Sequence, residues 1–254
     1  MGRLLESRLI EKGHEITAVV EPFCKSKQLP SGAAVYATLR DALAGIEGKG
    51  LKDADAVIEF TTPDAAYENI LFLAGEKIPL ITGTTGWYDR MSEVEKAVAA
   101  SGSSLLWSPN FSLGVNIFYR IAANAAKLID PFEDYDVGGF EAHHNKNADS
   151  PSGTAKILVE RVLSQMTRKK KAVYRMPERS LAGDELHFAS LRLGSQPGIH
   201  SLAFDSAADT IEITHTARSR EGLASGAVLA AEWLVRKKQA GIFTFDDVLA
   251  DILP

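Results

Sequence analysis

Apolar residues in the first half of the chain occur in two patterns, one with the period of a helix and one of continuous runs with the length of a strand. Residues 3–12 place Leu4, Leu5, Leu9 and Ile10 on one helical face. Further on, short apolar runs alternate with segments of helical period. The expected strands are 15–20, 55–60, 78–82 and 104–107, and the expected helices after the first are 63–74 and 88–100. Strands that alternate with helices predict a parallel sheet covered on both faces.

The pattern changes after residue 113. Helices are expected at 114–129, near 153–166 and at 223–238, and strands at 135–142, 187–194, 199–205 and 210–217. Short turns with Gly and Asp join the last three strands, which predicts an antiparallel meander. The chain is therefore predicted to be α/β, with a Rossmann-like doubly wound nucleotide domain and a smaller α+β domain with a mixed open sheet. The first domain takes residues 1–113 and 222–254, and the second takes 114–221.

The first helix stands where a doubly wound nucleotide domain normally has a strand and a glycine-rich turn. Gly2 lies directly before that helix, in the place of the last glycine of such a turn. One interpretation is that Met1 is the natural start and Gly2 has no special role. We favour the other, in which the first strand and most of the turn are absent, because the rest of the half is a regular α/β pattern.

An acidic residue, Glu21, ends the expected strand 15–20, which would be the second strand of a complete nucleotide domain. A carboxylate in this position can accept hydrogen bonds from an adenosine ribose. Lys25 and Lys27 follow closely and could pair with a 2′-phosphate. NADH and NADPH are therefore both candidates for the cofactor.

Composition narrows the classes of partner. The 254 residues carry 28 Lys and Arg against 33 Asp and Glu, a net charge of −5, which argues against a nucleic-acid or membrane-surface binder. A single cysteine, Cys24, excludes an internal disulfide and a thiolate metal cluster. No apolar run has the length of a membrane span, and a cytoplasmic location is expected. The basic run 168–171 is interpreted as a solvated helix end.

The segment 141–154 carries the strongest chemical signal. His143 and His144 end an expected strand, and Ser152 and Thr154 lead directly into a helix. A helix N-terminus binds carboxylate or phosphate groups, and a nearby histidine can move a proton near neutral pH. Alternatively, Ser152 only caps its helix while the histidines pack in the sheet. We favour the functional interpretation because all these groups occur within fourteen residues. A metal site is not expected, since adjacent histidines on a strand point to opposite faces.

With these motifs the chain resembles the dihydrodipicolinate reductases. The family signature E-x-H-H-x-x-K-x-D-[AS]-P-S-G-T-A matches at Glu141, His143, His144 and from Asp149 to Ala155. Other matches cover almost the whole chain in the right order. They are residues 60–63, 82–87, 108–116, Arg192, Gly194, Gly198, His200, 211–212, His215, Ala217, Arg220, Ala224 and 226–227.

The resemblance implies an NAD(P)H-dependent reductase of lysine and diaminopimelate biosynthesis, which reduces a dihydrodipicolinate-type cyclic imine dicarboxylate to tetrahydrodipicolinate. It implies that His143 transfers the proton and that the substrate contacts His144, Ser152, Gly153 and Thr154. It also implies that the second domain mediates assembly of a homotetramer. Cofactor contacts are expected at Gly2, Arg3, Glu21, Phe60, Gly83, Thr84, Thr85, Ser108, Pro109, Asn110 and Phe111.

One departure affects the catalytic residues. The family has a second catalytic group, a lysine, three residues after His144, and this chain has Asn147 there. Lys146 lies one position earlier, and we expect it to take the catalytic role, with Asn147 at the substrate. The alternatives are a divergent member with another substrate and a non-catalytic ligand-binding relative. A second departure is Leu223 in place of the usual Phe, an apolar exchange that need not affect the chemistry.

Overall fold

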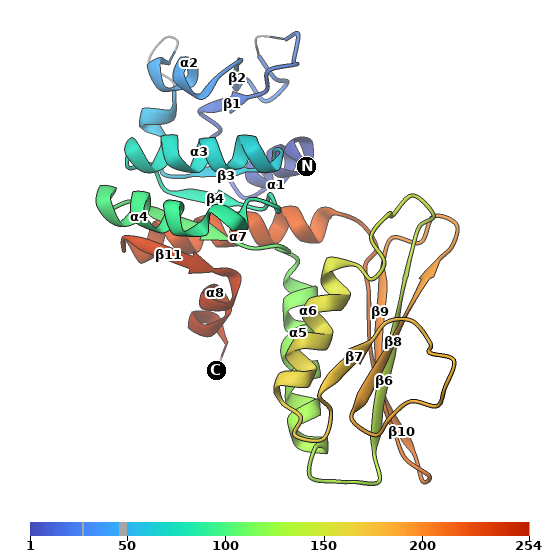
Figure 1. Ribbon diagram of the computed structural model, residues 1–254. Coiled ribbons are helices and arrows are strands. Elements are labelled where there is room, and N and C mark those ends of the chain that lie inside the picture. Colours follow the sequence, from blue (N-terminus) through green and yellow to red (C-terminus); the bar gives the residue numbers. More distant parts are fainter. Residues whose placement is uncertain (27, 46–49, 254) are drawn as a thin grey trace. The chain divides into compact units, whose positions relative to one another are not determined.

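The computed structural model describes residues 1–26, 28–45 and 50–253. The chain folds as two compact units (Figure 1), one made of Met1–Ser112 with Leu223–Pro254 and the other of Leu113–Gly222. Among the described residues no helix is both long and apolar enough to cross a bilayer. Each unit has its own sheet and core, so each is described separately.

The first unit is built from parallel strands and helices in alternation. Its elements are α1 (Gly2–Glu11), β1 (Ala18–Val20), β2 (Ala34–Tyr36), α2 (Leu39–Ala44), β3 (Val57–Glu59), α3 (Pro63–Gly75), β4 (Leu80–Thr82), α4 (Met91–Ser101), β5 (Ser104–Trp107), α7 (Glu221–Lys237), β11 (Gly241–Thr244) and α8 (Phe245–Ile252), with short 3₁₀ turns at Leu51–Asp53 and Tyr88–Arg90. Four strands pair in parallel in the order β11-β5-β4-β3, and β1 and β2 pair in parallel as a separate sheet.

Successive residues of the central strands face different helices. Leu80 and Leu105 belong to a cluster with α2, α3 and α4. Ile81 and Leu106 belong to another cluster with α1, α7 and α8. Side chains alternate along a strand, so both faces of the sheet are apolar and both are covered. This is the α/β architecture that the alternation of strands and helices predicts.

The second unit is a mixed five-stranded sheet with two helices. Its elements are α5 (Leu113–Ile129), β6 (Asp136–His143), α6 (Gly153–Ser164), β7 (Lys171–Val173), β8 (Glu185–Arg192), β9 (Ile199–Asp205) and β10 (Thr210–Thr216). The strand order is β10-β9-β6-β8-β7. The central strand β6 runs parallel to β8 and antiparallel to β9. Its core joins residues of α5 and α6 to Val137, Leu186, Phe188, Leu202 and Phe204 of the sheet. The predicted fold class is thereby confirmed for both units.

Two expectations from the sequence are wrong. The last three strands do not form a meander, because β6 lies between β8 and β9 and only β9 and β10 form a hairpin. The run 168–171 is not a solvated helix end, since α6 stops at Ser164. Lys169 is only 4% exposed, and its ammonium lies 2.6 Å from the Asp136 carboxylate. Long-range pairing determined both outcomes, and local pattern does not report it.

Several short elements were not expected at all. Strands β2 and β7 have three residues each, which is too few to show a period. Helix α2 has six residues, and β11 and α8 follow one another without a turn between them. Strands β7 and β11 are outer strands of their sheets, and β2 pairs only with β1, so these elements do not change the fold class.

Candidate active site

The buried carboxylate of Glu141 organises the second unit at the end of its central strand. Glu141 is fully buried on β6, and the strand register sets it between Ser190 of β8 and His200 of β9. The register also sets His143 opposite Arg192. Residues that lie far apart in the sequence therefore converge because three neighbouring strands carry them on one face of the sheet.

Glu141 accepts hydrogen bonds from several elements at once. The Ser152 N–H donates at 2.9 Å, the Ser190 hydroxyl at 2.8 Å and the Arg192 guanidinium at 3.0 Å, and the Ser152 hydroxyl donates as well. The Nε2 atoms of His143 and His200 each lie 3.4 Å from its Oε2 atom. Burial would raise the pKa of Glu141, but the bonds from His200, Ser152 and Ser190 outweigh burial and hold the pKa well below its usual range.

His143 is held beside this carboxylate with little exposed surface. Its Nε2 atom lies 3.4 Å from that of His200, and the two rings meet edge to face. Burial lowers the pKa of His143, and the nearby His200 adds to the effect, while Glu141 opposes it. A side chain at Gly198 would approach the His143 ring at 3.2 Å. A positive φ of 146° at Gly198 also favours glycine, so the backbone comes close to the imidazole.

The start of α6 is anchored to the same carboxylate. Ser152 is the N-cap of this twelve-residue helix, and its hydroxyl accepts from Ala155 N–H at 3.1 Å. Both the N–H and the hydroxyl of Ser152 bind Glu141, and the residue is 4% exposed. Its side chain thus positions the helix start and does not offer an open donor. Gly153, which is exposed, and Thr154 follow in the first turn, where N–H groups point along the helix axis.

The candidate lysine lies in a turn and not in a strand. Asn147 N–H donates to His144 C=O at 3.0 Å, which closes a turn over residues 144–147. Lys146 is exposed in this turn, whereas Asn147 is half-buried and its carbonyl accepts from Arg192 at 3.3 Å. The lysine at position 146 in place of position 147 is therefore a shift within a loop. Side chains in a loop do not alternate between two faces as they do along a strand.

The donor atoms of Glu141, His143 and His200 lie within 4.8 Å of one another, which is compatible with metal ligation. The same carboxylate already binds the Arg192 guanidinium and the Ser152 hydroxyl. A carboxylate paired in this way has less to offer a cation. The arrangement therefore fits a hydrogen-bonded cluster around a histidine better than it fits a metal centre. His144 and His215 are outside this group.

In the first unit a second buried carboxylate, Glu59, joins the loops after β3 and β4. It accepts from the Thr84 hydroxyl at 3.0 Å and from the hydroxyls of Thr61 and Thr82. Thr61 N–H donates in turn to the Thr84 hydroxyl at 2.7 Å. A side chain at Gly83 would lie only 2.1 Å from the Phe60 ring. The loop ends are thus closely packed at the carboxyl ends of parallel strands, where such sheets bind nucleotides.

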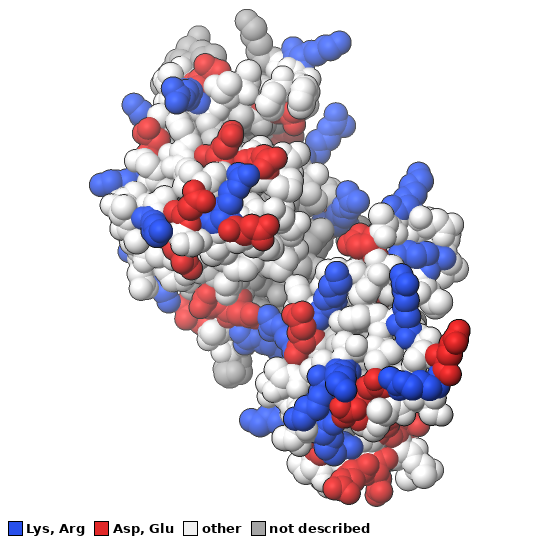
Figure 2. Space-filling view, viewed as in Figure 1, with Lys and Arg blue, Asp and Glu red and all other residues white. Residues whose placement is uncertain are grey.

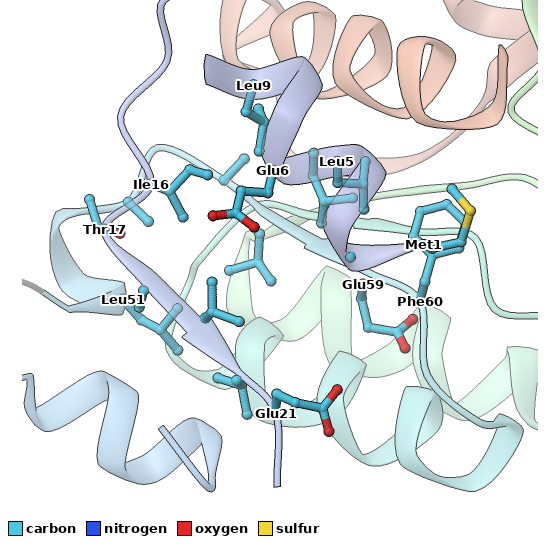
Figure 3. Close-up of a pocket in the computed structure, with 18 of the residues that line it drawn as sticks. Met1, Leu5, Glu6, Leu9, Ile16, Thr17, Glu21, Leu51, Glu59 and Phe60 are labelled. Carbon is cyan, nitrogen blue, oxygen red and sulfur yellow. The ribbon is translucent and has the colours of Figure 1, made fainter. Parts of the chain in front are cut away.

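The cofactor candidates separate into two groups. Gly2, Arg3, Glu21 and Phe60 line one cavity of about 2570 Å³ (Figure 3). The candidates after β4 and β5 are outside it, and Phe111 is 1% exposed with its ring against Phe60 and Phe245. Of the two basic candidates for a 2′-phosphate, Lys25 is exposed and Lys27 lies outside the described residues. The second group comprises Gly83, Thr84, Thr85, Ser108, Pro109, Asn110 and Phe111.

Figure 2 shows basic and acidic side chains interspersed on the visible face of each unit. The described basic side chains visible on this face therefore do not form one broad basic surface. In the sequence, Glu141, His200 and Arg192 are only matches to separate family motifs. Their shared position in one cluster depends on strand register, which the sequence pattern does not give.

Comparisons with known proteins agree over both units. The family model described as "Dihydrodipicolinate reductase, N-terminus" matches residues 1–111, and that described as "Dihydrodipicolinate reductase, C-terminus" matches residues 114–249. The 4-hydroxy-tetrahydrodipicolinate reductase of Christiangramia forsetii is 40% identical over 209 residues, 82% of this chain and 85% of that protein. The same enzyme of Methanococcoides burtonii is 39% identical over 196 residues, 77% of this chain and 73% of that protein.

Solved structures agree on the fold. The dipicolinate-bound dihydrodipicolinate reductase from Paenisporosarcina sp. TG-14 has a TM-score of 0.75 at 18% identity, over 99% of this chain and 95% of that one. An amine dehydrogenase from Mycobacterium smegmatis has a TM-score of 0.60 at 12% identity, over 97% of this chain and 92% of that one.

Proposed function

The chain belongs to the dihydrodipicolinate reductase family, the reductases of lysine and diaminopimelate biosynthesis, and from this premise we propose its reaction and the roles of its residues. The reaction is reduction of a dihydrodipicolinate-type cyclic imine dicarboxylate to tetrahydrodipicolinate. The observation that supports it most is the Glu141 cluster, which holds a histidine beside a helix start suited to a carboxylate.

His143 is the proposed proton donor. Its ring is fixed by Glu141 and His200 and is mostly buried. Burial lowers the pKa of His143 in the free protein. A bound dianionic substrate would act in the opposite direction, because negative charge nearby favours the imidazolium form. The proton is then available when substrate is present, for the ring atom that becomes negatively charged as hydride adds to its neighbour.

The first turn of α6 is the proposed seat of a substrate carboxylate. Gly153 and Thr154 lie at the positive end of the helix dipole, and the Glu141 bonds to Ser152 hold this turn in place. His144 and Asn147 are proposed as further substrate contacts. Lys146, exposed in the adjoining turn, is the proposed second catalytic group.

The first unit is proposed to bind the cofactor. The family uses NADH or NADPH, and a bound cofactor would supply the hydride. The closely packed loops after β3 and β4 lie at the carboxyl ends of parallel strands, where such sheets bind nucleotides. Glu21 directly follows β1, which is the position of a residue that would bind the ribose. The candidates after β4 and β5 are proposed to line the nicotinamide, with Gly2, Arg3 and Glu21 nearer the pyrophosphate and ribose. We retain both nicotinamide cofactors, since Lys25 is exposed near Glu21.

The second unit is also proposed to form a homotetramer. Its sheet is covered by helices on one face, and Phe140 and Leu191 are 40% and 51% exposed on strands β6 and β8. Exposed apolar side chains on an open sheet face are typical of an interface between subunits.

Turnover and binding test this proposal separately. Oxidation of NADH or NADPH by the chain with dihydrodipicolinate is expected, and His143→Ala should lower kcat by about a hundredfold or more while dipicolinate still binds. Lys146→Ala should lower kcat too. Adding Asn147→Lys to that variant tests whether a lysine at the family position restores kcat. Calorimetry with dipicolinate in the absence of cofactor measures ligand binding by the second unit.

Full activity of His143→Ala would contradict the assignment of His143 as the proton donor. If Lys146→Ala has no effect on kcat, the lysine assignment fails and Asn147 marks a departure in mechanism. A chain that binds both dipicolinate and a nicotinamide cofactor could still fail to oxidise that cofactor in the presence of dihydrodipicolinate. This result would favour the divergent-substrate alternative. Failure to bind either ligand would favour a non-catalytic relative.

A further inference from the structure

Arg192 lies at the end of β8, beside the loop that carries the candidate lysine. This loop, residues 144–150, directly follows β6. Lys146 and its neighbours at 145 and 148–150 are exposed, whereas the Arg192 side chain is only 19% exposed. A polar side chain with so little exposed surface needs acceptors for its N–H groups. The identity of these acceptors indicates the role of Arg192.

Each nitrogen of the Arg192 guanidinium donates a hydrogen bond. Nη2 donates to the Glu141 carboxylate at 3.0 Å and also to Asp149 C=O. Nε donates to Asn147 C=O at 3.3 Å, and Nη1 donates to Leu191 C=O at 2.7 Å. Because every nitrogen has an acceptor in the protein, the guanidinium is not an open site for a substrate carboxylate. Arg192 therefore acts on the chain around it.

Two of the four acceptors belong to the backbone of the exposed loop. Arg192 binds the carbonyls of both Asn147 and Asp149. Beyond β8 there is a further tie, in which Asn145 N–H donates to Gly194 C=O at 3.3 Å. A loop with few buried side chains opens at little cost in free energy, so its conformation depends on such bonds. Arg192 thus holds the turn of the candidate lysine against the sheet.

The guanidinium itself is anchored on Glu141. This carboxylate is fully buried, and its Oε2 atom lies 3.4 Å from the Nε2 atom of His143. Ser152 holds the same carboxylate at the start of α6. One planar group therefore joins a fixed anchor beside the proposed proton donor to two carbonyls of the loop. A lysine here would keep a charge beside Glu141, but its compact ammonium lacks the flat fork that spans these acceptors.

We propose that Arg192 is the positioning residue of the turn with Lys146, and that it holds this turn at a fixed distance from His143 through the Glu141 carboxylate. The inference rests on the proposed function, in which Lys146 is the second catalytic group. It adds a condition to that function. A lysine displaced by one position can serve only in a loop with a fixed backbone, because a misplacement of about 1 Å can lower a rate about a hundredfold.

Arg192→Lys is the decisive variant, because it keeps the positive charge beside Glu141 and removes the fork. The kcat for reduction of dihydrodipicolinate should fall about tenfold or more. Affinity for dipicolinate, measured by calorimetry, should fall less, since Ser152 still holds the proposed carboxylate seat on α6. Arg179→Lys is the matched control. Arg179 binds Glu185 through two nitrogens, at 2.8 and 2.7 Å, at the other end of β8, so the same exchange there should leave kcat unchanged.

A double-mutant cycle tests whether Arg192 acts through Lys146. In a chain that already carries Lys146→Ala, the further change Arg192→Lys should lower kcat by less than about twofold, because the group that Arg192 positions is absent. A loss of kcat through general damage to the site would instead persist in that background.

Amide hydrogen exchange, followed by NMR, gives a second readout that needs no turnover. In Arg192→Lys the hydrogen-bonded amides of Asn145 and Asn147 should exchange about fivefold faster or more. The Ala217 amide is bonded at 2.8 Å just beyond the paired ends of β9 and β10. Its exchange rate should stay that of the parent, which shows that the sheet is intact.

Several outcomes overturn the proposal. Either the parent's kcat or the parent's exchange rates at Asn145 and Asn147 in Arg192→Lys would do so. An equally large loss of kcat in the Lys146→Ala background would show that Arg192 acts on another group. A loss of dipicolinate affinity as large as the loss of kcat would make Arg192 a substrate contact instead. If the parent shows no turnover, or Lys146→Ala keeps full kcat, the proposed function fails. The exchange rates then still decide whether Arg192 holds the turn: faster exchange upholds it and unchanged exchange overturns it.

Discussion

Two buried glutamates have the same structural role at the residue scale. Glu59 joins the loops after β3 and β4 through three threonine hydroxyls, and Glu141 joins β6, β8, β9 and the start of α6. A buried carboxylate is stable only when its acceptor sites are filled, so each one fixes the groups around it. In both units the carboxylate positions candidate site residues and is not itself a candidate for the chemistry.

Glycines in the first unit make a testable contrast at this scale. A side chain at Gly226 of α7 would lie 1.7 Å from the backbone carbonyl oxygen of Phe111, which cannot turn away. Gly226→Ala should therefore destabilise the protein by about 3 kcal/mol or more, measured as the free energy of unfolding in urea. The segment with Phe111 is a cofactor candidate, so loss of nicotinamide affinity is expected as well.

Gly75→Ala is the matched control, because Gly75 is also helical and a side chain there meets nothing within 4 Å. This change should leave stability within about 1 kcal/mol of the parent or raise it, since alanine restricts the unfolded chain. Equal unfolding free energies for the two variants would mean that α7 does not pack on the Phe111 backbone as described.

At the scale of elements, α1 is held in place by its contacts with α7 more than by burial of its own residues. The helix buries only Leu5, and its position is fixed by packing on α7 and by an ion-pair group at its end. There the Lys12 ammonium lies 3.0 Å and the His14 ring nitrogen 2.9 Å from the carboxylate of Glu232 on α7. Residues of α1 also line the cavity of the first unit, so the attachment of this helix affects that cavity.

The Glu232 group makes a pH-dependent prediction for this pair of helices. Burial would raise the pKa of Glu232, but the bonds from His14 and Lys12 outweigh burial and lower it below its ordinary value of 4.5. A carboxyl with a lowered folded-state pKa stabilises the protein above the unfolded value, and this contribution is lost as the pH falls through the folded value. Glu232→Gln should thus lower the urea midpoint at pH 7, and the difference from the parent should shrink at acid pH.

Glu11→Gln serves as the comparison for that experiment. Glu11 pairs with Arg8 on the same helix at 2.7 Å, but its side chain is 67% exposed. Exposed pairs contribute little, so the midpoint at pH 7 should change less than in Glu232→Gln. A Glu232→Gln difference that stays constant from neutral to acid pH would argue that the charge of Glu232 is not involved.

At the scale of the whole molecule, the two units have complementary proposed tasks. The first has the parallel sheet suited to a nucleotide, and the second has the histidine cluster and the open sheet face. The family assignment rests on both, because separate family models match the two halves of the chain. The open face of the second unit is where assembly is expected.

Assembly is tested by one charge on the open sheet face. Phe140→Lys should convert the expected tetramer to a smaller species, because a buried unpaired ammonium is costly at an apolar interface. Light scattering after size-exclusion chromatography measures the mass. Phe132→Lys is the control, since Phe132 is 59% exposed in the loop before β6 and off the sheet. A parent that elutes as a monomer would contradict the tetramer, and an intact Phe140→Lys tetramer would place the interface elsewhere.

The sequence by itself determined the features that depend on near neighbours. Helical period, apolar strand runs and the segment from Glu141 to Thr154 are local, and they predicted the α/β first half, the mixed second half and the family. The helix expected near 153–166 is likewise a local feature, and in the structure it begins directly after its N-cap Ser152.

Only the tertiary structure decided how strands far apart in the sequence are ordered. The insertion of β6 between β8 and β9 overturned the expected meander, and the same insertion brings His200 and Arg192 to Glu141. The cavity of the first unit was not visible in the sequence either, since it is lined by β1 and β3, which belong to separate sheets. Strand order and register follow from the joint burial of many side chains, and no single segment of the chain contains that information.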